Sequence, residues 1–167
     1  EADRVHVNRL VNGELNLEGY HIMAVPGGFS FGDHLGSGRL MGNRLRFGLR
    51  EQVRNFVKSG KPVIGICNGF QVLVKMGLLP GDDDVSLTQT ASLALNDSGH
   101  YENRWATLEF DSRSHCIWTK GMTRIRVPVR HGEGKFVTAD KNLLDDWSEA
   151  GQLVVKYVDP SSEYPSS

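Results

Sequence analysis

The chain has 167 residues, of which 39% are hydrophobic, and its 19 lysines and arginines nearly balance 20 aspartates and glutamates. This length is enough for one α/β domain with a sizeable core and too short for two ordinary domains. A net charge of −1 lacks the basic excess of nucleic-acid-binding proteins. No apolar stretch approaches the roughly 18 residues of a membrane span. We therefore expect a single domain, residues 1–167, with neither nucleic acid nor membrane as partner.

The cysteine content and the start of the sequence indicate a reducing compartment. The first residues, "EADRVHV", do not have the basic and apolar regions of a signal peptide. Cys67 and Cys116 are the two cysteines, and two thiols without an export signal are typical of an intracellular protein. We expect a cytoplasmic location.

The first half of the chain alternates strand and helix patterns. Residues 4–10 and 21–28 are rich in β-branched and apolar residues, which predicts two short strands. Residues 40–58 predict one helix with an apolar face of Leu45, Leu49, Val53, Phe56 and Val57. Arg46, Arg50 and Arg54 follow at steps of four on another face, which is either solvated or a docking surface.

The second half is dominated by strand patterns. Residues 77–90 are rich in turn residues, and alternating or β-branched runs predict strands at 104–110, 123–130 and 151–159. We predict a mostly parallel sheet with a β-rich insertion at residues 85–135. The Pro/Ser-rich residues 159–167 have the composition of a loop or frayed end.

A single cysteine stands between two glycines in "KPVIGICNGFQVLVKMG", residues 61–77. The apolar run before Cys67 predicts a buried strand, and the apolar spacing after it predicts a helix that ends at Gly77. The pattern Gly65-x-Cys67-x-Gly69 at a strand-to-helix turn matches the nucleophile elbow, whose sharp turn leaves no room for side chains two positions away. The alternative is a small structural cysteine packed between glycines.

The predicted elbow would also activate the thiol. A thiol at the N-terminus of a helix faces the positive end of the helix dipole, which favours the nucleophilic thiolate. The backbone N–H of Asn68 would point toward the same place and could stabilise an oxyanion.

A second glycine-rich stretch, "VPGGFSFGDHLGSGRL" at residues 25–40, follows the second predicted strand. Gly27 and Gly28 would let backbone N–H groups approach a ligand closely, as an oxyanion hole requires. The alternative is a loop without a ligand. Its spacing matches neither phosphate-binding glycine motif, so we do not expect a nucleotide there.

The stretch "RHGEGKF" at residues 130–136 contains His131 and Glu133. In a strand these two residues would face the same side, and a cysteine hydrolase needs a histidine base oriented by a carboxylate. A polar hairpin turn explains the stretch equally well. No metal-ligand spacing is present, so we expect no metal.

Together these motifs resemble a known family, the glutaminase (class I glutamine amidotransferase) component of phosphoribosylformylglycinamidine synthase. The resemblance rests on "RVHVN", "PGGFSFGDHLGSG", "GICNGFQVLVKMGLLPG", "NDSGHYENRW" and "PVRHGEGKF", in the family's order. It implies a flavodoxin-like three-layer sandwich of the class I glutamine amidotransferase type.

The resemblance also implies a role for each matching residue. Cys67 would attack the carboxamide carbon of glutamine, giving a thioester and ammonia. The backbone amides of Gly28, Phe29 and Asn68 would form the oxyanion hole. Gly27, Gln71 and His131 would bind glutamine. A separate synthetase subunit or domain would use the ammonia with ATP and Mg²⁺, so no cofactor is expected in this chain.

One departure from the family concerns the general base. The family's catalytic histidine and glutamate come from a His-Pro-Glu segment, which does not occur in these 167 residues. The family also has a strand and a helix before the "RVHVN" segment, so the chain resembles a partial domain. His131 and Glu133 match a different family motif and are the less favoured candidates for base and orienter, and we expect weak glutaminase activity or none from these residues alone.

Two alternatives to the glutaminase remain open from the sequence. One is a peptidase or glyoxalase of the DJ-1 group, which also carries a cysteine at an elbow. The other is a non-catalytic remnant that only binds a partner protein. Glutamine-protectable labelling of Cys67 would favour the glutaminase over both.

Overall fold

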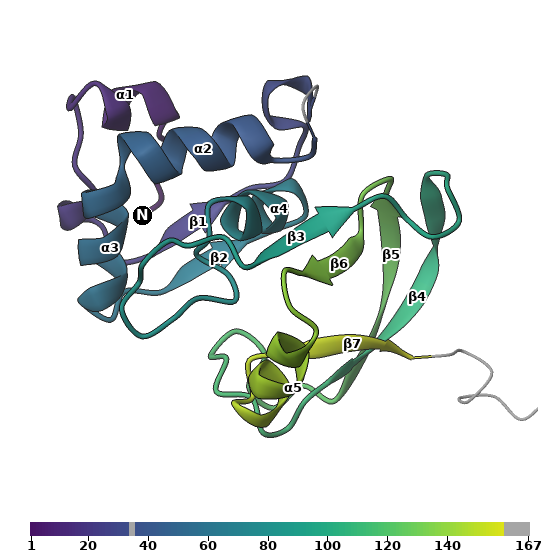
Figure 1. The fold of residues 1–167 in the computed structure, drawn as a ribbon. Coiled ribbons are helices and arrows are strands. Elements are labelled where there is room, and N and C mark those ends of the chain that lie inside the picture. Colours follow the sequence, from purple (N-terminus) through teal and green to yellow (C-terminus); the bar gives the residue numbers. More distant parts are fainter. Residues whose placement is uncertain (34–35, 159–167) are drawn as a thin grey trace, which may run out of the picture. The chain divides into compact units, whose positions relative to one another are not determined.

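The computed structural model describes residues 1–33 and 36–158 (Figure 1). Contacts within the chain divide it after Leu93 into two compact units, and each unit is described by itself. The expected tail at residues 159–167 lies outside the described part. A single domain with an insertion at residues 85–135 stays a prediction.

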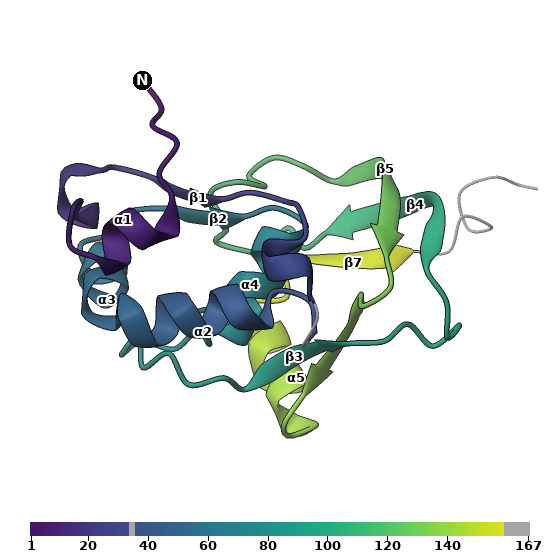
Figure 2. The same ribbon diagram turned by 90° about the horizontal axis from the view of Figure 1, so that it is seen from above.

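The first unit contains a parallel pair of strands, β1 (Met23–Val25) and β2 (Val63–Gly65). Met23 stands opposite Val63 and Val25 opposite Gly65, and Figure 2 shows the two strands side by side. The other elements of this unit are α1 (Val7–Val11), the 3-10 turns η1 (Leu17–Gly19) and η2 (Ser30–Asp33), α2 (Arg39–Gly48), α3 (Arg50–Lys58), α4 (Asn68–Lys75) and β3 (Ala91–Ala94), which reaches the unit boundary.

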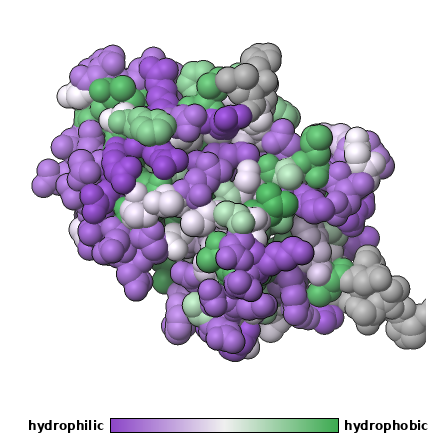
Figure 3. Space-filling model, in the orientation of Figure 1, coloured by the Kyte–Doolittle hydropathy of each residue, from purple (hydrophilic) through white to green (hydrophobic). Residues whose placement is uncertain are grey.

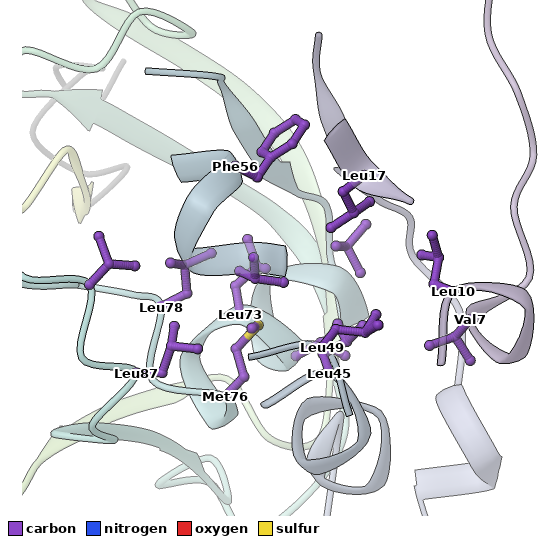
Figure 4. Close-up of a cluster of buried hydrophobic side chains, with 14 residues drawn as sticks. Val7, Leu10, Leu17, Leu45, Leu49, Phe56, Leu73, Met76, Leu78 and Leu87 are labelled. Carbon is purple, nitrogen blue, oxygen red and sulfur yellow. The ribbon is translucent and has the colours of Figure 1, made fainter. Parts of the chain in front are cut away.

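The core of the first unit consists of apolar side chains from its helices, its strands and the segment after α4 (Figure 4). Val53 of α3 and Val72 of α4 are completely buried, as is Met76 just after α4. Burying one such aliphatic side chain contributes about 1.5–3 kcal/mol, so this cluster is the main stabilising feature of the unit. Hydrophilic residues cover most of the face shown in Figure 3. Within the described residues, no helix combines the length and apolar character needed to cross a membrane.

Helix α4 ends at Lys75, and the glycine predicted to stop it, Gly77, follows the C-cap residue Met76. Gly77 has φ +82°, a conformation that costs a residue with a Cβ far more than glycine. The Gly77 N–H donates to the Val74 carbonyl (3.0 Å), and the Leu78 N–H donates to the Leu73 carbonyl (3.0 Å). This pair of bonds is a Schellman motif, which satisfies two carbonyls that the helix end would leave unpaired.

The second unit is built on an antiparallel sheet in the order β5–β4–β7. β4 pairs with β5 through Trp105 opposite Pro128, and with β7 through Leu108 opposite Tyr157. In β6 and α5, Phe136 and Trp147 pack edge to face, with ring centroids 6.3 Å apart. The bounds are β4 (Glu102–Phe110), β5 (Arg124–His131), β6 (Lys135–Thr138), α5 (Asn142–Glu149) and β7 (Val155–Val158).

The predicted strand at residues 4–10 is wrong, because this segment contains helix α1. The side chain of His6 accepts a hydrogen bond from the Asn8 N–H (3.2 Å) and caps the first turn. Val7 and Leu10, three residues apart, are the buried positions. A helix satisfies its own backbone groups, whereas a strand here would need a neighbouring strand to bond with.

The single helix predicted at residues 40–58 is two helices, α2 and α3, separated by Leu49 (φ −127°, ψ 17°). Leu49 is nevertheless buried, so the apolar face runs through the break. The three arginines therefore do not share one helix, and each contacts a group of its own. Arg46 lies over the Phe47 ring (5.4 Å), Arg50 Nη2 donates to the Ser86 carbonyl (2.6 Å), and Arg54 pairs with Glu51 (3.4 Å).

The α/β class is confirmed, but a mostly parallel sheet is not what the described residues form. β1 and β2 pair in parallel, whereas the larger sheet β5–β4–β7 is antiparallel. Consecutive strands without a crossover helix pair antiparallel, which is how β4 and β5 are connected. The sequence patterns also did not indicate β3, β6 or α5.

Candidate active site

Cys67 lies at a sharp turn between β2, which ends at Gly65, and α4, which begins at Asn68. Its backbone adopts φ 54° and ψ −113°, which is strained for a residue with a side chain. Its thiol is free and the residue is exposed. A strained, accessible residue at a strand-to-helix turn is the arrangement predicted for a nucleophile elbow.

The two glycines that flank Cys67 are required by their neighbours. A Cβ on Gly65 would stand 2.7 Å from the Gly69 carbonyl oxygen, and a Cβ on Gly69 would stand 1.9 Å from the Val25 carbonyl oxygen. Real Cβ atoms do not approach backbone oxygens so closely. The spacing Gly65-x-Cys67-x-Gly69 therefore follows from the tightness of the turn and its contact with β1.

The loop after β1 lies beside the nucleophile, since β1 and β2 are parallel and their carboxyl ends meet at one edge. The Ile66 N–H donates to the Val25 carbonyl (3.0 Å) and continues the pairing past β2. A Cβ on Gly27 would be 3.2 Å from the Cys67 Cβ and 4.0 Å from its Sγ. The carboxyl ends of parallel strands are the usual place for ligands in open α/β sheets.

Asn68 links the turn around Cys67, residues 65–69 (the nucleophile turn), to the glycine-rich loop that follows β1 and contains Gly27 and Gly28 (the glycine loop). Its side chain is buried, with 1% of the residue exposed. Its Oδ1 accepts hydrogen bonds from the Ser30 N–H (3.0 Å) and the Ser30 hydroxyl (2.6 Å), and its Nδ2 donates to Gln71 Oε1 (3.1 Å). Gln71, expected to contact glutamine, is thus held by Asn68 in this structure. No motif in the sequence indicates these contacts of Ser30 and of the Asn68 side chain.

Two of the three expected oxyanion donors are available in this loop. Among the described residues, no acceptor is bonded to the N–H of Gly28 or of Phe29. Gly28 has φ +140°, a region that favours glycine, and the Phe29 side chain is 75% exposed. The N–H of Asn68 opens helix α4, where backbone N–H groups have no partner within the helix.

In the second unit, Asn96 holds the turn that follows His131. Its Oδ1 accepts from the Gly134 N–H (3.0 Å), and its Nδ2 donates to the carbonyls of His131 (2.8 Å) and His100 (2.9 Å). Asn96 Oδ1 also lies 2.9 Å from His131 Nδ1. The motifs "NDSG" and "HGEG" are therefore parts of one hydrogen-bonded cluster.

The structure does not place His131 and Glu133 on one face of a strand, as their spacing predicted. β5 ends at His131, and Glu133 lies in the bend that follows. The Nδ1 position, where a catalytic orienter would bind, is taken by Asn96. The Tyr157 hydroxyl lies 3.4 Å from His131 Nε2, and desolvation raises the pKa of that hydroxyl against a smaller opposing effect of Arg104.

No group of three or more potential metal ligands occurs among the described residues. The first unit also has an open polar pocket of about 320 Å³ that does not include Cys67. Its lining consists of Arg39, Asn43, Lys75, Gln89 and Ser92.

Comparison with known proteins gives consistent results. The profile of one family, described as a CobB/CobQ-like glutamine amidotransferase domain, matches residues 1–167. Phosphoribosylformylglycinamidine synthase subunit PurQ of Treponema denticola is 42% identical over 183 residues, covering 99% of this chain and 67% of the relative. The subunit of the same name from Dehalococcoides mccartyi is 45% identical over 173 residues, covering 100% of this chain and 64% of the relative.

A solved structure agrees with these relatives. A chain in the structure of PurLQS from Thermotoga maritima matches with a TM-score of 0.62 and 29% identity, covering 87% of this chain and 59% of that chain. The chain thus spans about two thirds or less of the length of these proteins.

Proposed function

Because the chain belongs to the family of CobB/CobQ-like glutamine amidotransferase domains, we propose that it is the core of a glutaminase that supplies ammonia to phosphoribosylformylglycinamidine synthase. The relatives from Treponema denticola and Dehalococcoides mccartyi bear the name of that enzyme's PurQ subunit. The observation that carries the proposal is the strained, exposed Cys67 at the turn between β2 and α4.

In the proposed reaction, the Cys67 thiolate attacks the carboxamide carbon of glutamine. The general base returns the thiol proton to the amide nitrogen, the C–N bond breaks, ammonia leaves, and a glutamyl thioester remains on Sγ. Water then attacks the thioester carbon, which releases glutamate and returns the thiol. The product ammonia is the nitrogen source for converting formylglycinamide ribonucleotide into formylglycinamidine ribonucleotide.

The oxyanion formed in each attack is assigned to the backbone N–H groups of Gly28, Phe29 and Asn68. Support comes from the closeness of Gly27 to Cys67 and from the unbonded N–H groups of Gly28 and Phe29 within the described residues. Losing one such donor typically costs about 10²–10³-fold in kcat. Gly27, Gln71 and His131 stay proposed glutamine-binding residues.

The general base is proposed to be a residue outside residues 1–167. The family's His-Pro-Glu segment is not in this sequence, and Asn96 rather than Glu133 contacts His131 Nδ1. A base contributes about 10²–10⁴-fold, so these residues alone should turn glutamine over slowly or not at all. We also propose that β1 and β2 belong to a larger parallel sheet of the flavodoxin-like type in the full-length protein.

The proposed partner is the synthetase, which would bind ATP, Mg²⁺ and the ribonucleotide. Support comes from the solved chain that resembles this one, which is part of the structure of PurLQS from Thermotoga maritima. The proposed pathway would place this chain beside the synthetase in the cytoplasm.

The experiment is labelling of Cys67 by a glutamine analogue with an electrophilic group, read by intact mass and peptide mapping. We expect one label per chain, prevented by glutamine and absent in Cys67→Ala. Cys116→Ala is the matched control and should label normally, since Cys116 is the other free thiol. Labelling that glutamine does not prevent would favour an elbow-cysteine peptidase or glyoxalase, and no labelling would favour a non-catalytic remnant.

A further inference from the structure

The orientation of the Asn96 side chain is fixed by three backbone groups. Its Oδ1 accepts from the Gly134 N–H, and its Nδ2 donates to two carbonyls, those of His131 and His100. If the amide oxygen and nitrogen were exchanged, the NH₂ group would face the Gly134 N–H, which is also a donor. The oxygen would then face the two carbonyl oxygens, which are also acceptors. The atom that faces His131 Nδ1 at 2.9 Å is therefore an oxygen.

This contact decides the tautomer of His131. An amide oxygen only accepts hydrogen bonds, so His131 Nδ1 must carry a proton. In the neutral ring the other nitrogen, Nε2, is then an acceptor. The hydroxyl of Tyr157, 3.4 Å from Nε2, can donate to it, which agrees with the same tautomer.

The ring is also fixed in place. A Cβ on Gly134 would lie 2.1 Å from both Nδ1 and Cε1 of His131, so the ring rests directly on the backbone of the turn. The distance from the Tyr157 hydroxyl to Nε2 is longer than that of an ordinary O–H hydrogen bond, so a stronger donor could replace the hydroxyl at Nε2.

We propose that Asn96 is a positioning residue that holds His131 in the Nδ1–H tautomer and so leaves Nε2 as a hydrogen-bond acceptor. The opposite tautomer would present a donor at Nε2 instead.

The test is nitrogen NMR of the full chain with ¹⁵N-labelled histidine at about pH 8, where an ordinary imidazole is mostly neutral. His131 is assigned by comparison with His131→Gln. We expect a protonated Nδ1 and an unprotonated Nε2 in the parent chain. In Asn96→Ala, resonances of the Nε2–H form should appear.

Asp97→Asn is the matched control for loosening of the turn. It weakens the ion pair between Asp97 and Lys135, which joins the same two segments, and leaves Asn96 in place. The tautomer of His131 should not change in this variant. An Nε2–H ring in the parent chain, or an unchanged ring in Asn96→Ala, would overturn the positioning role.

Discussion

Gly69 of α4 lies so close to β1 that a Cβ on it would stand 1.9 Å from the carbonyl oxygen of Val25. The same carbonyl accepts the N–H of Ile66, so it is fixed by the pairing of the two segments. The first turn of α4 is thus pressed against the end of β1, and this contact brings the nucleophile turn to the glycine loop.

We predict that Gly69→Ala destabilises the protein by about 3 kcal/mol or more, because the obstructing atom belongs to the backbone and cannot rotate away. The free energy of unfolding in urea measures this. Gly19→Ala is the control, since a Cβ there would meet nothing within 4 Å, and it should change stability by about 0.5 kcal/mol or less. Equal effects of the two substitutions would contradict the tight contact.

Relief of strain at Cys67 gives a second prediction. At φ 54° and ψ −113°, a residue with a Cβ costs about 1–3 kcal/mol that glycine largely avoids. Glycine loses more backbone entropy on folding, which offsets part of this gain. Cys67→Gly should therefore be more stable than Cys67→Ala by about 1 kcal/mol in urea unfolding, and both should lack labelling by the glutamine analogue. A less stable glycine variant would mean that the turn is not strained.

Asn68→Ala should loosen the glycine loop. The substitution removes the acceptor of the Ser30 N–H, and an unsatisfied amide costs about 1–3 kcal/mol. Hydrogen exchange at the Ser30 amide should accelerate together with the loss of stability. Ser30→Ala is the matched comparison. It removes the hydroxyl but keeps the hydrogen bond from the backbone N–H of residue 30 to Asn68, so it should lower the free energy of unfolding by less. An unchanged Ser30 exchange rate in Asn68→Ala would refute this link.

The pH dependence of Asp111 follows from its ion pair with Arg113. Two side-chain bonds from Arg113 and one from its backbone N–H lower the pKa of Asp111 from 3.8 to about 2. The pair therefore contributes stability above pH 3.8, and the contribution is lost as the pH falls toward 2. A ¹³C titration of the carboxyl group should give a midpoint near 2, and Arg113→Gln should raise it. A midpoint near 3.8 in the parent chain would rule out the pair.

Much of the nucleophile turn could be predicted because its requirements are local. Gly65, Cys67 and Gly69 are close in sequence, and a buried strand before them and an apolar helix after them leave few possible geometries. The end of α4 just before Gly77 was predictable for the same reason, since one glycine supplies the left-handed conformation.

Features that depend on distant residues could not be predicted from patterns. Residues 4–10 have the composition of a strand, but the structure uses Val7 and Leu10 as one buried helical turn. The Asn96 contact joins residues 35 positions apart, and nothing in the spacing of "HGEG" indicates it. The likeness of His131-x-Glu133 to a catalytic pair was a local pattern that the end of β5 at His131 does not support.

The bond between Asn68 and Ser30 has a consequence for how the site would respond to a reagent. The buried Asn68 side chain joins the first turn of α4 to the loop that carries Ser30, so a displacement of one would be passed to the other. Chemistry at Cys67 would then be sensed at Ser30 without any ligand touching the serine, and a tight inhibitor could be recognised by the slowed exchange of a single amide in the neighbouring loop.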